Sequence, residues 1–302
     1  LSSEVMDYYT DNINILLSLI EQVITISNDA EITVLAQSYI ILINAKEKAG
    51  IERALVSRVF KQARLSSEEF HRFGALVSAQ KMYIKHFKGM ALKEHVDMFT
   101  STIDTDMRKG ILRGRNTIYI KNKKNEILSS MKDYIGYGGL IHNFKNYLVR
   151  GKTIYFERYK RLLTDVTEIM NRYKEIPGLD STDYFHLNAI ESTIELYYLM
   201  LQKVVVLKEN GLSITEIDQQ VKIDDTQALK SINYLRTGMT QLDVNQWWEL
   251  STQRISFMKE VSVKLKSDII QLVELNRETS RNSLILYTGL TVFTLLFSLF
   301  MG

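Results

Sequence analysis

The chain has a single proline, Pro177, among its 302 residues, and this scarcity of helix breakers constrains the fold more than any other feature. Proline ends or kinks a helix because it lacks a backbone N–H and fixes φ. Apolar residues recur at helical spacing between the few breaks, as in the segment from Ile13 to Ile24. We therefore predict an all-α fold: two stacked or nested four-helix bundles, with a long C-terminal helix that runs into a transmembrane helix.

The composition excludes several kinds of site. The chain has no cysteine, so it forms neither disulfides nor thiolate metal sites. Its five histidines form no HExxH pair, and no glycine-rich loop carries the Lys-Ser/Thr that a phosphate loop needs. We therefore expect no catalytic residues, no metal and no cofactor here. Any enzymatic activity would belong to an output domain outside this chain.

Breaks and shifts in composition divide the chain into four parts. We predict a first bundle segment over residues 1–110, an inserted helical bundle over 111–238, a returning helix over 239–281, and a transmembrane helix over 282–302. Two serine and glutamate pairs at capping-box spacing, Ser66 with Glu69 and Ser213 with Glu216, predict helix starts. Within the first part we predict helices over about 2–27, 31–64, 66–88 and 90–112.

The segment from Asn282 to Gly302 contains no charged residue and is about as long as a helix needs to be to cross a bilayer. A buried core helix is the alternative. Arg277 and Arg281 precede the segment. Basic residues favour the cytoplasmic side of a membrane. The two arginines therefore count against an extracytoplasmic position for the residues before the segment. If the helix that begins near Trp247 continues into this segment, it forms a mechanical link to the membrane.

The segment from Met107 to Asn125 carries seven basic residues and no acidic one. Such a cluster can neutralise phosphates, and Tyr119 could stack on a base, so nucleic-acid binding is one reading. Contact with anionic lipids is another. We favour a solvated connection between two subdomains, and the net charge of +3 gives no reason to expect a nucleic-acid partner.

Three segments, AKEKAGIERA from Ala45 to Ala54, AQKMYIKHF from Ala79 to Phe87, and QWWELSTQRISFMKEV from Gln246 to Val261, resemble the nitrate- and nitrite-sensing (NIT) family. The resemblance implies an all-helical domain of a bacterial signalling protein that binds nitrate or nitrite through arginines between helices. It singles out Arg53 as a ligand contact. Lys46 and Lys48 stand where the family often has arginine. Alternatively, Glu52 and Arg53 pair with neighbouring helices.

The inserted part offers a second candidate site. The segments IGYGGLIHNFKNYLVRG, from Ile135 to Gly151, and EIDQQVKIDDTQAL, from Glu216 to Leu229, resemble extracytoplasmic regions of bacterial chemoreceptors and diguanylate cyclases. A donor-rich stripe lies close to one helical face here, formed by His142, Lys145, Asn146 and Arg150. The stripe is either an anion site or part of a salt-bridge network with Asp218, Asp224 and Asp225.

Together these features predict the ligand-binding region of a bacterial transmembrane receptor that senses a small anion such as nitrate or nitrite. We expect a homodimer in the bacterial inner membrane, with residues 1–281 in the periplasm, a further membrane helix before Leu1 and an output domain after Gly302. The expected partners are a small-molecule anion and the membrane. The rival interpretation is a tail-anchored helical protein with a structural or tethering role and no small ligand.

Overall fold

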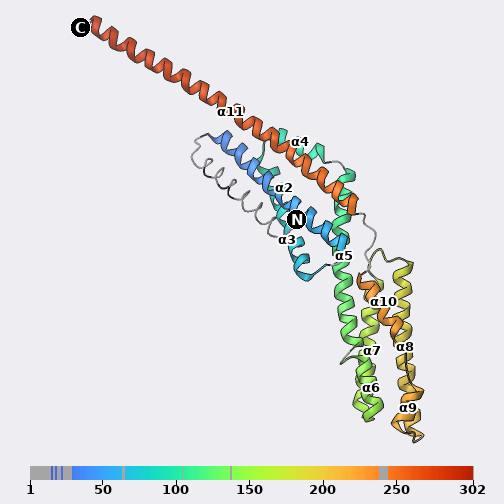
Figure 1. The fold of residues 1–302 in the computed structure, drawn as a ribbon. Coiled ribbons are helices and arrows are strands. Elements are labelled where there is room, and N and C mark those ends of the chain that lie inside the picture. The colour runs from blue at the N-terminus through green and yellow to red at the C-terminus, as the bar shows by residue number, and fades with distance from the viewer. Residues whose placement is uncertain are drawn as a thin grey trace. The chain divides into compact units, whose positions relative to one another are not determined.

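The computed structural model describes residues 15, 18, 22, 29–62, 65–103, 105–136, 138–237 and 244–301, without the side chains of 105 and 292–301. All regular structure in this part of the chain is α-helical, which confirms the predicted fold class (Figure 1). The helix predicted over residues 2–27 lies almost entirely outside the described residues. The arrangement as two four-helix bundles stays a prediction.

The helices follow one another with short connections. Their bounds are α2 Ala30–Gln62, α3 Ser67–Met90, α4 Lys93–Thr102, α5 Thr105–Ile135, α6 Leu140–Arg150, α7 Thr153–Lys174, α8 Ser181–Glu209, α9 Ile214–Gln220, α10 Thr226–Thr237 and α11 Val244–Met301.

Both predicted capping boxes are confirmed. At the start of α3, the Ser66 backbone N–H donates to Glu69 Oε2 at 2.9 Å, and Ser66 Oγ accepts from the Glu69 N–H at 3.1 Å. The Ser213 and Glu216 pair makes the same reciprocal contacts at the start of α9. Each pair satisfies two backbone donors that the first helical turn leaves without partners.

The helix predicted over about 90–112 is wrong, because the chain breaks within it. The helix α4 ends at Thr102, and Ile103 takes an extended conformation with φ −86° and ψ 94°. A new helix, α5, begins at Thr105 and runs for 31 residues. The basic segment from Met107 to Asn125 therefore lies inside a helix, and its interpretation as a solvated connection between two subdomains stays a prediction.

Two of the seven basic side chains in that segment are buried and serve the fold. Lys121 Nζ donates to the Arg236 carbonyl at the end of α10, at 2.7 Å. Lys124 Nζ lies 3.0 Å from Asp183 Oδ2 on α8. A cation next to the last carbonyls of a helix satisfies them and favours the helix dipole. These two lysines thus hold α5 to α10 and α8.

The chain divides into two compact units. The first comprises Leu1–Ser57, His71–Ile111 and Asn245–Gly302, and the second comprises Arg58–Phe70 and Leu112–Val244. The core of the first unit joins α2, α3, α4 and α11 through Leu35, Leu42, Ala49, Phe87, Phe99, Met258, Val261 and Leu265. The core of the second is larger and is centred on buried residues such as Met131, Tyr159, Tyr173, Leu187, Ile190 and Leu201.

Within the first unit, α2 and α11 lie side by side and antiparallel (Figure 1). Near the start of α2, Asn276 Nδ2 donates to Asp29 Oδ2 at 2.6 Å. Further along α2, Arg53 Nη1 donates to Thr252 Oγ1 at 2.9 Å. The same number of residues separates the two contacts on each helix, so the axial register between them is constant. The helix α11 is continuous to Met301.

The segment predicted to cross the membrane, residues 282–302, continues α11 as far as Met301. None of the helices in the described part of the chain is both long enough and apolar enough to span a bilayer. From residue 292 onward, the side chains of the predicted segment lie outside that part.

In the second unit, a short turn that contains Gly136, Gly138 and Gly139 joins α5 to α6. Gly138 has φ +88°, a conformation that favours glycine. A Cβ on Gly139 would lie 1.9 Å from the Tyr134 carbonyl oxygen, so only glycine fits there. The buried Asn143 side chain on α6 donates to the carbonyls of Gly138 and Gly139 at 3.2 and 2.9 Å, which fixes the turn.

Candidate functional site

Arg53 on α2 faces α11 and contacts it through both side chain and backbone. In addition to its hydrogen bond to Thr252, its guanidinium carbon lies 4.3 Å from the centre of the Trp248 ring. The N–H of the fully buried Trp247 indole donates to the Arg53 carbonyl at 3.3 Å. A cation over an aromatic face is attracted by the ring electrons. The position of Arg53 is therefore fixed from the α11 side.

The charge of Arg53 has no carboxylate partner among the described residues. Its Nε is buried and finds no hydrogen-bond acceptor in that part of the chain. Burial lowers the pKa of Arg53, because the charged form loses hydration. The guanidinium is a planar fork of N–H donors that matches a planar oxyanion. The site thus presents a fixed cation with a donor still to be satisfied.

The preceding residue, Glu52, is fully buried and joins three helices. Its Oε2 accepts hydrogen bonds from Gln80 Nε2 on α3 and from Arg254 Nη2 on α11, both at 2.9 Å. Arg254 Nη2 also donates to Gln80 Oε1 at 2.9 Å. Glu52 is therefore paired with a cation of a neighbouring helix, whereas Arg53 has no carboxylate partner among the described residues.

Lys46 lies two helical turns before Arg53, on the side of α2 that faces α11. Burial lowers the pKa of Lys46; the carboxylate of Glu47 opposes this effect, and the ammonium of Lys259 on α11 adds to it. Two ammonium groups that repel each other across a helix pair form a local positive potential. Lys48 is half-buried, and its ammonium makes no hydrogen bond or ion pair within the described residues.

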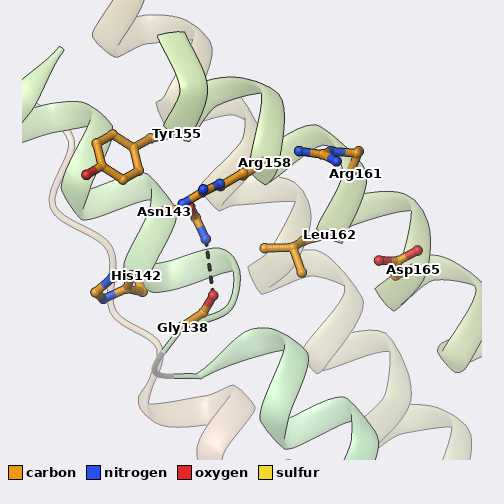
Figure 2. A pocket seen from close by; sticks show the side chains of 8 residues that line it. All are labelled: Gly138, His142, Asn143, Tyr155, Arg158, Arg161, Leu162 and Asp165. Atoms are coloured by element: carbon orange, nitrogen blue, oxygen red, sulfur yellow. Dashed lines mark hydrogen bonds between the residues drawn. The ribbon is translucent and has the colours of Figure 1, made fainter. Parts of the chain in front are cut away.

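A hollow of about 530 Å³ lies between α6 and α7 in the second unit. Its lining combines several donors with one carboxylate and consists of Gly138, His142, Asn143, Tyr155, Arg158, Arg161, Leu162 and Asp165 (Figure 2). Arg158 and Arg161 stand on successive turns of α7. Neither has a hydrogen bond or an ion pair within the described part of the chain.

Comparison with known proteins concerns the residues around Arg53 and not the hollow between α6 and α7. The family described as nitrate and nitrite sensing, NIT, matches residues 1–136. The match covers fewer than half of the 302 residues. The match confirms the suspected family and includes Lys46, Lys48, Glu52 and Arg53. No curated protein and no solved structure matches the chain.

The NIT match does not reach every segment that resembles the family. The segment from Gln246 to Val261 lies beyond residue 136, so its resemblance stays a prediction. In the structure this segment belongs to α11 and provides Trp248, Thr252 and Arg254, which contact Arg53 and Glu52. The hollow between α6 and α7 also lies outside the NIT match.

The predicted donor stripe on α6 is only partly assembled. His142 lines the hollow, and Arg150 Nη1 donates to the hydroxyl of Tyr155, a lining residue, at 2.8 Å. The Asn146 side chain donates to the His142 carbonyl within α6, and Lys145 points to solvent outside the hollow. The salt-bridge alternative has one related contact, from the hydroxyl of Tyr197 to Asp225 at 3.3 Å, which does not involve the stripe.

Sequence reasoning missed the α7 side of the hollow. Tyr155, Arg158, Leu162 and Asp165 recur at spacings of three and four, which places them on one face of α7. That periodicity was visible in the sequence, but the facing helix was not. Thr252 and Trp248 were likewise inside a segment that resembles the NIT family, without any sign that they meet Arg53.

One group of side chains in the described residues brings three potential metal ligands together, namely Glu94, His95 and Asp268. Their arrangement is better explained by hydrogen bonding and by an ion pair between Asp268 and Lys264. The buried His95 Nε2 lies 2.8 Å from Asp268 Oδ2, and Lys264 occupies the other carboxylate oxygen. Burial alone would raise the pKa of Asp268, but hydrogen bonds from Lys264 and His95 outweigh it and lower that pKa. The group ties α4 to α11.

Proposed function

We propose that the chain is the ligand-binding region of a bacterial signalling receptor and that its NIT part binds nitrate or nitrite beside Arg53. The proposal rests on one observation above all: Arg53, inside the NIT match, holds a partly buried guanidinium with no carboxylate partner among the described residues. A charge removed from water needs an opposite charge or hydrogen-bond partners. A small planar oxyanion supplies both.

The surroundings of Arg53 support an anion rather than a cation or a neutral ligand. Lys46 and Lys259 add positive charge along the same pair of helices. The nearest buried carboxylate, Glu52, is already bound by Arg254 and Gln80. The side chain of Thr252 accepts from Arg53 and donates to the Trp248 carbonyl, so it holds the guanidinium in place without neutralising it.

The receptor part of the proposal follows from where the ligand would bind. An anion beside Arg53 would touch residues that fix α2 against α11. A ligand shifts a conformational equilibrium only if it contacts the two conformations differently. A change in the α2–α11 contacts would supply that difference. The chain acts by binding and displacement rather than by catalysis.

The membrane part of the proposal is supported by the sequence. The uncharged segment from Asn282 to Gly302 is the proposed anchor in the bacterial inner membrane, with residues 1–281 in the periplasm. The proposed homodimer is supported by exposed apolar residues on α11, among them Val263, Ile270 and Val273. Light scattering of the purified chain tests the dimer, and a monomer at all concentrations would exclude it.

Calorimetric titration of the purified chain with sodium nitrate, sodium nitrite and sodium chloride tests the proposed ligand. We expect nitrate or nitrite to bind and chloride not to. Charge-assisted hydrogen bonds contribute about 1.5–3 kcal/mol each, so Arg53→Ala should weaken binding at least about tenfold. Arg53→Lys keeps the charge but loses the planar fork and should fall between the two.

The matched control is Arg58→Ala, which removes another arginine of α2 that pairs with Glu69 at 3.0 Å. This variant should bind like the unaltered chain. The proposal is wrong if neither nitrate nor nitrite binds, or if Arg53→Ala and Arg58→Ala bind equally well.

A further inference from the structure

The hollow between α6 and α7 is lined by solvent-exposed charges that make no ion pair within the described residues. Arg158 and Arg161 lie on successive turns of α7, where side chains three apart are neighbours. The adjacent acid, Glu157, is 3.8 Å from Lys160 instead. Asp165, one turn further, makes no ion pair with either arginine within the described residues. Two cations and one anion thus face the same space.

A hydroxyl and an imidazole add further hydrogen-bonding groups to this space. The hydroxyl oxygen of Tyr155, a lining residue, accepts from Arg150, so its own O–H remains available to donate. His142 contributes an imidazole from the α6 side (Figure 2). A site lined by two guanidiniums, a hydroxyl and an imidazole is matched to a ligand with several carboxylate oxygens.

The frame of the hollow is fixed before any ligand arrives. Asn143, only 4% exposed, holds the glycine turn through its two hydrogen bonds to Gly138 and Gly139. Gly151, with φ +64°, ends α6 and leads directly into α7. A frame that is ordered in advance lowers the entropic cost of binding.

We propose that this hollow is a second ligand site, independent of the NIT part, and that it binds a small dicarboxylate carrying an amino or hydroxyl group. Arg158 and Arg161 would each take a carboxylate, and Asp165 would accept from the amino or hydroxyl group. The volume of about 530 Å³ falls in the range of small-molecule sites and is far larger than nitrate or nitrite requires. The site therefore differs from Arg53 in both size and charge pattern.

A matched series of ligands tests this assignment. L-Aspartate, L-malate and succinate share a four-carbon dicarboxylate and differ only in an amino group, a hydroxyl group or neither. In calorimetric titrations of the full chain we expect L-aspartate or L-malate to bind and succinate to bind at least tenfold more weakly. If none of the three binds, or if succinate binds as tightly as the others, the proposal is wrong.

Variants locate the binding. Arg158→Ala and Arg161→Ala should each weaken binding of the preferred ligand at least tenfold, whereas Arg172→Ala, at an exposed position near the end of the same helix, should leave it unchanged. Asp165→Asn distinguishes a ligand with an amino group from one with a hydroxyl group, because it should weaken the binding of L-aspartate more than the binding of L-malate. Equal losses of binding affinity in Arg158→Ala and Arg172→Ala would contradict the proposed site.

The Arg53→Ala variant keeps this test separate from the proposed nitrate site. Dicarboxylate binding should survive that substitution, and nitrate binding should survive Arg158→Ala. Loss of dicarboxylate binding in Arg53→Ala would show that the α6–α7 hollow is not where the ligand binds.

Discussion

Glu52 on α2 and Arg254 on α11 form a buried ion pair, with 2.9 Å between Glu52 Oε2 and Arg254 Nη2. The pair lies immediately beside Arg53 and Thr252, which are joined across the same two helices. The Glu52–Arg254 contact pairs two opposite charges, whereas Arg53 has no carboxylate partner in the described part of the chain. The Glu52–Arg254 pair therefore holds α2 against α11 directly beside Arg53.

Replacing Glu52 by alanine should strongly destabilise the first unit. Arg254 is 7% exposed, and without Glu52 its charge would remain buried beside the neutral side chain of Gln80. Breaking a buried pair from one side costs about 3–5 kcal/mol. Urea denaturation followed by circular dichroism measures the loss. The double variant Glu52→Leu/Arg254→Met, which removes both charges, should recover most of it, and a double variant no more stable than Glu52→Ala would contradict this account.

Tryptophan emission should report anion binding at Arg53. Trp248 is 47% exposed and carries the Arg53 guanidinium over its ring, whereas Trp247 is buried. Neutralising that guanidinium with nitrate or nitrite should change the emission of Trp248. Trp248→Phe should abolish the change, and Trp247→Phe should retain it. The Arg53→Ala variant at equal salt controls for collisional quenching, and an identical response from that variant would refute the prediction.

The stability of the chain should rise with pH through the buried Lys121. Burial, together with the nearby Lys124, lowers the pKa of Lys121 to about 8, although Asp183 opposes the shift. The ordinary lysine value is 10.5. Between these two pH values the unfolded chain binds the extra proton, so the free energy of unfolding increases with pH.

Comparison with Lys121→Met isolates this effect. The slope of the unfolding free energy against pH between 8 and 10 should be steeper in the unaltered chain, by at most about 1.4 kcal/mol per pH unit. Lys123→Met, at an exposed position on the same helix, should keep the steep slope. Equal slopes in all three proteins would mean that Lys121 keeps an ordinary pKa when folded.

Two glycine-to-alanine substitutions should act in opposite directions. Gly139→Ala would place a Cβ 1.9 Å from the Tyr134 carbonyl, so the turn between α5 and α6 must distort and the second unit should lose stability. Gly74 lies inside α3, where an added Cβ would meet nothing within 4 Å, and Gly74→Ala should stabilise by about 0.5–1 kcal/mol. Thermal unfolding of both variants measures the signs, and a stabilising Gly139→Ala would contradict the assigned turn.

Local sequence signals predicted the helices well where the chemistry is local. The Ser66 and Ser213 caps, and the glycine break before α6, depend on residues a few positions apart. The break between α4 and α5 carries no glycine or proline, so no strong helix breaker marks Ile103 in the sequence. Counting charges over residues 107–125 likewise could not tell that Lys121 and Lys124 are buried.

The candidate sites show the same division. Arg53 was singled out because its segment resembles the NIT family, and the family match covers it. Its contacts with Thr252 and Trp248 join distant positions, 199 residues apart in the case of Thr252, which helical periodicity does not reveal. Of the α6 stripe, only His142 lines the hollow. The other wall of the hollow comes from α7, and the sequence does not reveal that α6 packs against α7.

The uninterrupted course of α11 from Val244 to Met301 has a consequence for protein engineering. Any reporter helix fused in frame to α11 inherits its rotational phase, and each inserted residue turns that phase by about 100°. Insertions of seven residues, close to two full turns, should preserve the response of a chimera, whereas insertions of two should place the reporter on the opposite face. A series of such fusions would measure how the output of the reporter depends on the rotational orientation of α11.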